Sequence, residues 1–331
     1  MNRLAIIIPY FGEFKPSISL FLASCNRNKD IDWFVFTDCH VPKGVTINSN
    51  IKWIPATLKD VRLLAEEKLG MCVELDRAYK LCDLKPFYGL IFENYLHDYE
   101  YWGYGDVDVV YGRLFHFLNQ IGYTHYDKIN WMGHLCFIRN NVRCNKAGLL
   151  HAKGTIEAEM VLRNSENVGF DERDFNIKCI KSGMKIYMGK WAADIDIFYW
   201  RMRCVDIWTL HLLLNTYAIK YAPRNYQKQI FAIVNGIAYR IYLKKGKVFF
   251  EEFAYIHFRK EYTIEFNELG IDSYIITREG FKLIENGKEL FSDYDKVLSI
   301  INKYNNQENW LQEKRCFLYH YYRKITGKRG W

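Results

Sequence analysis

Apolar runs of strand length alternate with helix-spaced apolar patterns through the first half of the chain. The run 4–10 (LAIIIPY) is apolar on both faces, which suits a strand in the middle of a parallel sheet. Strand patterns return at 32–37 and 52–54, and again at 99–104. This alternation predicts an α/β fold in which a single Rossmann-type, mostly parallel sheet is flanked by helices.

The helix patterns carry recognisable end signals. Ser17 precedes apolar residues at i, i+3, i+4 and i+7 and is expected to cap a helix. Thr57 with Asp60 three residues later predicts a capping box, and Gly70 offers the matching C-cap. Pro86 suits the first turn of a helix over 86–96.

The pattern weakens beyond about residue 191. Residues 233–256 predict a β-hairpin that turns at Lys245-Gly246-Lys247. A terminal helical segment follows a small region of strands and turns. The prediction is therefore a C-terminal β-hairpin and helical extension attached to the α/β body.

The net charge of +8 is concentrated at the C-terminus. From residue 314 onward there are six basic residues and no acidic residue, so the rest of the chain is nearly neutral. This distribution argues against a nucleic-acid-binding protein. The basic residues of the tail alternate with aromatic ones, which indicates either peripheral contact with an anionic membrane surface or a solvated terminal helix.

The cysteines and the N-terminal segment indicate the cellular compartment of the protein. The nine cysteines are scattered and form no C-x-x-C pair, which disfavours a zinc ribbon or a disulfide framework. The apolar run after Arg3 ends at Pro9 and is short for a signal peptide. We expect a cytoplasmic protein, with peripheral contact at the inner face of the cytoplasmic membrane as a further possibility.

Four D-x-D triplets occur, and their surroundings distinguish them. The triplets at 30–32 and 293–295 lie in polar segments that read as turns. The triplet at 194–196, between two tryptophans, is a minor contender for a site. Asp106 and Asp108 follow an aromatic strand and stand among glycines, which let a backbone approach a ligand closely.

Three polar segments fall at the carboxyl ends of predicted strands. They are 9–12, 37–38 and 106–108. Ligands of open α/β sheets bind beyond this edge, so the three segments are expected to meet in one crevice. Two carboxylates at one strand end can hold a divalent cation. The sequence therefore predicts a metal site at Asp106 and Asp108.

Six segments resemble a bacterial family of GT-A-type glycosyltransferases that assemble polysaccharide and lipopolysaccharide. They read IIIPYFG, FTD, KLCDLKPFYG, WGYGDVDVVYG, YDKINWMGH and YIHFRK. More distantly, the chain is similar to the glycogenin and lipopolysaccharide galactosyltransferase group. The resemblance implies a catalytic, nucleotide-sugar-binding domain over 1–262, followed by an extension over 263–331.

The resemblance also implies roles for individual residues. Asp106, Asp108 and His257 would bind Mn²⁺ or Mg²⁺, with the histidine favouring manganese. Asp108, Asp171 and Glu172 would be catalytic. The nucleotide sugar would contact Pro9, Tyr10, Phe11, Thr37, Asp38, Asp83, Lys85, Asp106, Gly133, His134, Arg259 and Lys260.

Together these features predict a metal-dependent transferase that moves a hexose from a nucleotide sugar, with UDP the expected nucleotide, to a saccharide or lipid-linked glycan. Retention and inversion at the sugar both stay open. In an inverting enzyme Asp171 or Glu172 would serve as the base. Two alternatives are a metal-dependent nucleotidyltransferase or phosphohydrolase, and a non-catalytic glycan-binding protein of cell-surface assembly.

Overall fold

The computed structural model describes residues 3–189, 191–196, 203–206, 220–221, 226, 228–258, 263–264, 271–277, 280–284, 287 and 293–305. They belong to two compact units. Unit 1 comprises the described residues up to 107 together with 114–189, and unit 2 comprises 108–113 and the described residues from 191 onward. This division by compactness does not test the expected end of a catalytic domain at residue 262, which stays a prediction.

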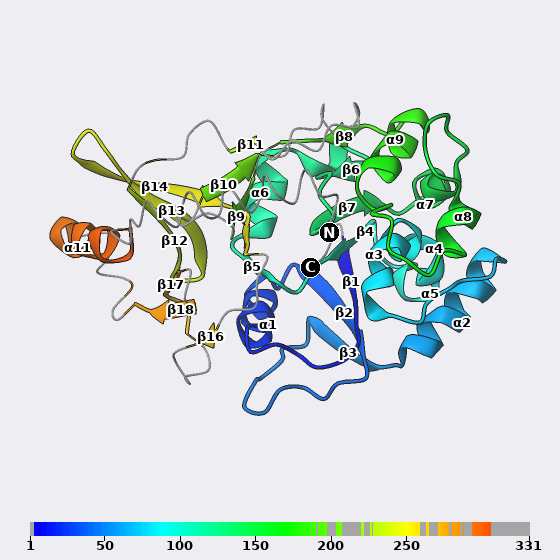
Figure 1. Ribbon diagram of the computed structural model, residues 1–331, viewed down its shortest axis with the longest axis horizontal. Helices are drawn as coiled ribbons and strands as arrows, with labels where there is room; N and C mark the ends of the chain where they lie inside the picture. The colour runs from blue at the N-terminus through cyan, green and yellow to red at the C-terminus, as the bar shows by residue number, and fades with distance from the viewer. Residues whose placement is uncertain are drawn as a thin grey trace, which may run out of the picture. The chain divides into compact units, whose positions relative to one another are not determined.

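Unit 1 is built on a seven-stranded sheet of order β3-β2-β1-β4-β7-β6-β8 (Figure 1). Its strands are β1 (Leu4–Tyr10), β2 (Ile31–Thr37), β3 (Ile51–Pro55), β4 (Tyr101–Gly105), β6 (Lys128–Ile129), β7 (Leu135–Arg139) and β8 (Ile186–Tyr187). The first four strands run parallel, whereas β7 is antiparallel to both of its neighbours. The prediction of an α/β fold with a mostly parallel sheet and flanking helices is confirmed.

The helical segments of unit 1 are mostly short. They are α1 (Ile18–Arg27), α2 (Leu58–Leu69), α3 (Leu81–Leu84), α4 (Tyr88–Ile91), α5 (Glu93–Leu96), α6 (Leu114–Gln120), α7 (Val142–Asn145), α8 (Ala158–Leu162) and α9 (Arg173–Lys181), with 3-10 turns at Ala78–Lys80, Lys85–Phe87, Tyr123–His125 and Ala147–Leu149. The predicted capping box of α2 is present, and Gly70 ends this helix in the left-handed conformation.

Two helix predictions were wrong in detail. Ser17 has helical backbone angles and makes no side-chain cap bond, because a capping residue needs an extended backbone. The continuous helix expected over 86–96 is instead a 3-10 turn followed by α4 and α5. The chain leaves helical geometry at Phe92, whose ring packs against Phe36 with centroids 4.5 Å apart. Burial of this aromatic ring outweighs the helical preference of the segment.

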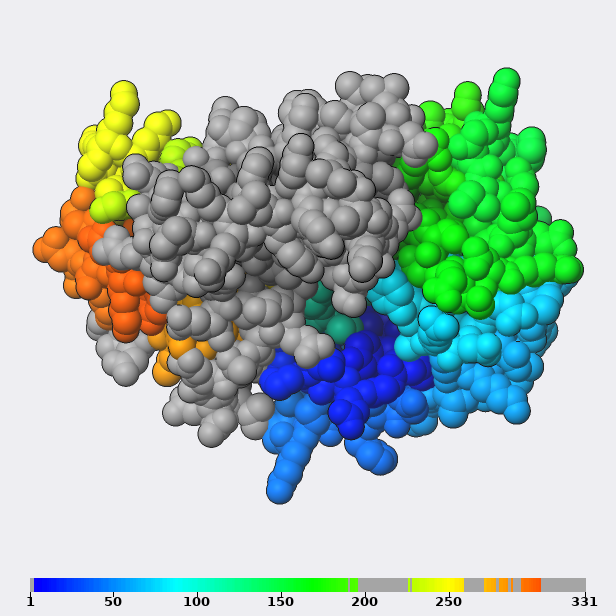
Figure 2. All heavy atoms as spheres, in the orientation of Figure 1, coloured from blue at the N-terminus to red at the C-terminus, as the bar shows by residue number. Residues whose placement is uncertain are grey.

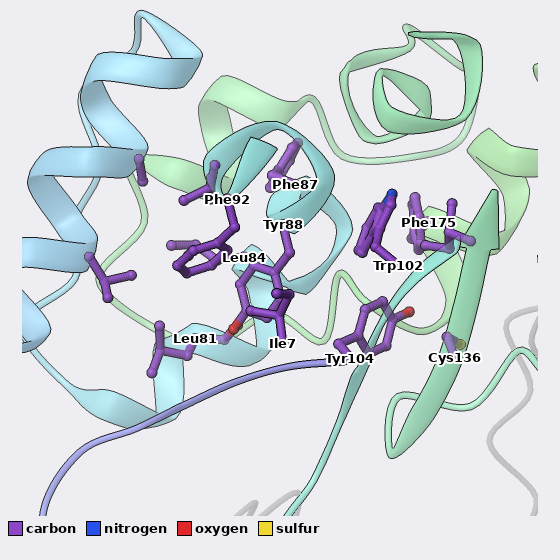
Figure 3. Close-up of a cluster of buried hydrophobic side chains, with 14 of the residues drawn as sticks. Ile7, Leu81, Leu84, Phe87, Tyr88, Phe92, Trp102, Tyr104, Cys136 and Phe175 are labelled. Atoms are coloured by element: carbon purple, nitrogen blue, oxygen red, sulfur yellow. The ribbon is translucent and has the colours of Figure 1, made fainter. Parts of the chain in front are cut away.

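The core of unit 1 is dominated by aromatic side chains from β4 and from residues 81–92 (Figure 3). Trp102 and Tyr104 of β4 are fully buried beneath α4. A Cβ atom on Gly89 would lie 2.5 Å from the indole of Trp102, so only glycine allows this close approach. The segment that carries Lys85 is therefore fixed on the sheet by large buried rings.

Unit 2 contains two further sheets, of order β11-β10-β9-β15-β5 and β14-β13-β12-β17-β18-β16. Its elements are β5 (Val109–Tyr111), β9 (Ala192–Asp196), β10 (Arg203–Asp206), β11 (Lys220–Tyr221), β12 (Gln229–Val234), β13 (Ile237–Lys244), β14 (Lys247–Phe253), β15 (Tyr255–His257), β16 (Thr263–Ile264), β17 (Tyr274–Ile276), β18 (Gly280–Leu283) and α11 (Tyr294–Asn305).

The expected hairpin is confirmed in β13 and β14. Its two-residue turn, Lys245 and Gly246, has positive φ at both positions, as a tight hairpin turn requires. Helix α11 packs on β12, β13 and β14 (Figure 1), and its Val297 and Ile301 share a buried apolar cluster with Ile230 and Ile241.

Within the described residues, no helix combines the length and the apolar character that crossing a bilayer requires. The basic aromatic tail from residue 314 lies outside the described residues. Its contact with a membrane surface stays a prediction.

The approach of β4 to β7 yields a first test. A Cβ atom on Gly103 would collide with the carbonyl oxygen of Cys136 on β7. We expect Gly103→Ala to lower the free energy of unfolding by about 1–3 kcal/mol, as overpacking in a core does. Urea unfolding followed by circular dichroism measures this loss.

The matched control is Gly70→Asn, because asparagine tolerates the left-handed conformation and no atom lies within 4 Å of the added Cβ. This variant should lose less than about 1 kcal/mol. An unchanged urea midpoint for Gly103→Ala would contradict the packing described for β4.

Candidate functional site

At the central D-x-D the chain passes from one sheet to another. Asp106 follows the last residue of β4, and its amide donates to the carbonyl of His134 at 3.2 Å in unit 1. Asp108 precedes β5, and its carbonyl accepts from the amide of Phe258 at 3.1 Å in unit 2. Each aspartate is thus held by the backbone of a different sheet, while one residue separates them in sequence.

The first group of polar side chains, the Lys85 cluster, comprises Lys85, Asp106, Asp171 and the carbonyl of Gly133. The Lys85 Nζ lies 2.6 Å from Asp106 Oδ1 and 3.3 Å from Asp171 Oδ2, and it donates to the Gly133 carbonyl at 3.0 Å. The side chains of Lys85 and Asp171 are each 7% exposed, whereas that of Asp106 is 32% exposed. Asp106 is therefore the member of the cluster that water and ligands reach.

The charges of this cluster depend on one another. Burial would lower the pKa of the Lys85 amine, but the carboxylates of Asp106 and Asp171 outweigh it and hold this pKa well above its usual value. Burial and the neighbouring Asp106 raise the pKa of Asp171 to about 6, although Lys85 acts in the opposite direction. A carboxyl group with such a pKa can exchange a proton near neutral pH.

Gly133 allows Asp171 to approach Lys85. A Cβ atom on Gly133 would lie 2.5 Å from Asp171 Oδ2 and 3.6 Å from the Glu172 side chain. Glu172 is half-buried at the start of α9, and His134 is buried. Five of the predicted site residues, Lys85, Asp106, Gly133, Asp171 and Glu172, therefore lie together in unit 1.

The second group, the His257 triad, comprises His257, Asp108 and Asp194 in unit 2. His257 ends β15, which pairs with β5 at Val109 on one side and with β9 at Asp194 on the other. His257 Nδ1 lies 2.9 Å from Asp194 Oδ1, and Nε2 lies 3.4 Å from Asp108 Oδ2. Burial would lower the pKa of His257, but Asp108 and Asp194 together raise it to about 10.

The triad has the donor set of a metal site. The Asp108 side chain is 39% exposed and offers oxygen beside Nε2 of His257. The other ring nitrogen faces the buried carboxylate of Asp194, the arrangement that fixes the ring of a metal-binding histidine. From the sequence, Asp194 was only a minor candidate for a site. Its pairing with His257 depends on contact between strands that are far apart in the chain, which the sequence does not reveal.

The strand ends at the start of the chain carry a second polar feature. Asp38 is exposed, and its Oδ1 accepts from the amide of Gly12 at 3.1 Å. Pro9 and Tyr10 are half-buried at the end of β1. Phe11 and Thr37 are buried, and the Thr37 hydroxyl accepts from the amide of Cys39. The contact of these residues with a nucleotide stays a prediction.

An aromatic group beside Asp38 was missed by the sequence analysis. The ring of Tyr10 stacks on Phe14 with centroids 4.7 Å apart, and Phe14 contacts Trp53 of β3 at 5.7 Å. All three side chains are half-exposed. Trp53 is the middle residue of β3, so an argument from the ends of strands does not find it.

Three other predicted residues belong to neither of these groups. Asp83 is fully buried and pairs with Lys80 at 2.7 Å. Arg259 and Lys260 lie outside the described residues.

The comparisons with known proteins give a family but no function. A family model matches residues 6–285, and the chain belongs to this family, which is described as a family of unknown function, DUF6625. No curated protein matches the chain.

The raised pKa of Asp171 predicts a pH dependence of stability. This pKa is about 6 in the folded protein and 3.8 in the unfolded chain, so the folded state binds the proton more tightly. The stabilisation is complete below pH 3.8 and is lost as the pH rises through 6. It amounts to about 3 kcal/mol, from 1.36 kcal/mol for each pH unit.

Asp171→Asn removes this titration and keeps the neutral form. Its free energy of unfolding, relative to that of the wild type, should therefore rise by about 2 kcal/mol between pH 4 and pH 7, because part of the stabilisation is already lost at pH 4. Urea unfolding at both pH values measures the change, with exposed Asp76→Asn as the control. A pH-independent difference between the wild type and Asp171→Asn would rule out the assigned environment.

Proposed function

We propose that this member of the DUF6625 family is a metal-dependent glycosyltransferase. It would transfer a hexose from a nucleotide sugar, a UDP-hexose, to a saccharide or lipid-linked glycan of the cell surface. The observation that carries the proposal is the pairing of Asp108, the second carboxylate of the D-x-D, with a histidine whose ring is oriented by Asp194. This donor set suits a divalent cation that also binds phosphate.

In the proposal, carboxylate oxygens of Asp106 and Asp108, which are separated by one residue in sequence, and Nε2 of His257 would hold the cation. These donors suit Mn²⁺ or Mg²⁺, and the imidazole favours Mn²⁺. The bound cation supplies positive charge for the diphosphate that leaves. His257 must lose its proton to bind, and Asp194 then keeps Nδ1 as the protonated nitrogen.

The strand ends of unit 1 support a nucleotide as the ligand. The half-exposed rings of Tyr10, Phe14 and Trp53 offer aromatic surface beside which a base can pack. The carboxylate of Asp38 lies beside the same group and can accept from a base N–H or a ribose hydroxyl.

In the transfer itself, the bond between sugar C1 and the phosphate oxygen breaks, and its electron pair leaves with UDP. The acceptor hydroxyl forms the new bond to C1 and gives up its proton. Asp171, with a pKa of about 6, or the neighbouring Glu172 can take this proton in an inverting reaction. Lys85 holds the carboxylate of Asp171 in place. In a retaining reaction the same carboxylates would face the donor sugar.

Binding gives the first test of this proposal. UDP with Mn²⁺ should raise the melting temperature of the wild type, since a ligand at about 100 times its Kd adds about 2.7 kcal/mol. Asp108→Asn should abolish the shift, and UDP without the metal should give none. The control is Asp295→Asn, an exposed member of another D-x-D. A shift that survives in Asp108→Asn would contradict the metal site.

Product analysis separates the proposed activity from its alternatives. With UDP-glucose and UDP-galactose as probes and Mn²⁺ present, water replaces the acceptor and the products are UDP and free hexose. Asp108→Asn should slow this release by at least about a hundredfold, as the loss of an electrostatic stabiliser does. Release of UMP with hexose phosphate, or of inorganic phosphate, would indicate phosphoryl transfer instead. Binding without turnover would favour a glycan-binding protein.

A further inference from the structure

Lys80 and Asp83 form a fully buried ion pair outside the residues assigned to chemistry. Their side chains are 1% and 0% exposed, and the Lys80 Nζ lies 2.7 Å from Asp83 Oδ2. Asp83 was expected to contact the nucleotide, but the structure turns it into the interior of unit 1. The pair must therefore act through other protein groups.

All other hydrogen bonds given for the two side chains go to one described segment, residues 161–170. Lys80 donates to the carbonyls of Val161 and Glu166, at 2.9 Å each. Asp83 accepts from the amides of Val168 and Phe170, at 2.9 and 2.8 Å. Val161 belongs to the last turn of α8, whereas Glu166, Val168 and Phe170 lie in the irregular connection between α8 and α9, so the pair ties the end of this helix to the connection that follows it.

The two ends of this connection lie next to the Lys85 cluster. Lys85 follows Asp83 by two residues, and Asp171 follows Phe170 directly. The ring of Phe170 stacks on Phe87 with centroids 5.6 Å apart. This contact also joins the segment that carries Lys85 to the segment that carries Asp171. In the space-filling view the cyan and green segments adjoin on one face of unit 1 (Figure 2).

We infer that Lys80 and Asp83 are a positioning pair, which binds residues 161–170 and so holds the carboxylate of Asp171 against Lys85. Buried ion pairs contribute little stability compared with apolar side chains of similar size, but they specify geometry. Four bonds to the end of α8 and to the connection before α9 are such a specification. Only the effect on turnover rests on the proposed glycosyltransferase activity.

A double-mutant cycle tests the positioning without any ligand. Lys85→Met, Asp171→Asn and their combination are made in the wild type and again in Asp83→Asn. At pH 7 the coupling between Lys85 and Asp171 should change the unfolding equilibrium constant about tenfold in the wild type, and less than about twofold in the presence of Asp83→Asn. Thr57→Ala, which removes the cap of α2, is the destabilised control in which the coupling should persist.

If Asp83→Asn lowers stability but leaves the coupling intact, the pair is merely structural and the inference is overturned. Should this variant not fold, Lys80→Met is tested by the same criterion, since it leaves both amide bonds of Asp83 in place.

Turnover of UDP-glucose with Mn²⁺ provides the second readout. Asp83→Asn should lower kcat at least about tenfold, while the Kd for UDP with Mn²⁺ stays within about twofold. An unchanged kcat would overturn the positioning role in catalysis. A wild type that neither binds UDP nor hydrolyses UDP-glucose refutes the proposed function, and the double-mutant cycle still decides the inference.

Discussion

The buried amine of Lys85 is neutralised by two carboxylates, and this cluster joins separate segments of unit 1. The Lys85 amine is nearly inaccessible to water, and Asp106 and Asp171 supply its compensating charge. One carboxylate comes from the end of β4 and the other from the residue before Glu172 and α9. The need to neutralise one charge therefore brings together segments that the sheet alone would leave independent. The outward-facing Asp106 retains the exposure that a ligand needs.

The parts of the fold that local rules govern could be predicted from the sequence. The run 4–10 formed β1 with the expected ends, and the capping box of α2 is present because Thr57 and Asp60 satisfy each other within one turn. The helix expected over 86–96 failed because its aromatic residues are buried on several sides, and no periodicity reveals which ring will interrupt the helix. Ser17 failed similarly, since the composition of a cap does not fix its backbone angles.

Some residues of the candidate site could likewise be predicted from local patterns, and others could not. Asp106 and Asp108 could be selected because strand ends are recognisable in sequence, and Lys85 contacts Asp106, Asp171 and the Gly133 carbonyl. Asp194 and Lys80 could not be assigned, since their partners are defined by strand pairing and loop contacts between distant residues. Asp83 shows the converse limit. Its carboxylate was predicted to contact the nucleotide, and no local pattern indicates that it is buried beside Lys80.

The contacts of Lys80 and Asp83 also determine at which stage of folding the Lys85 cluster forms. The bonded residues are separated in sequence by between 81 and 87 positions. A long loop must therefore close before any of these bonds can form. Contacts of this range form slowly compared with hairpins and helical turns. A chain that has completed β1 to β4 but not the junction with residues 161–170 has native strands and an unassembled Asp171. The Lys85 cluster is therefore complete only after this long-range closure, whereas the strands and helical turns around it depend on shorter contacts.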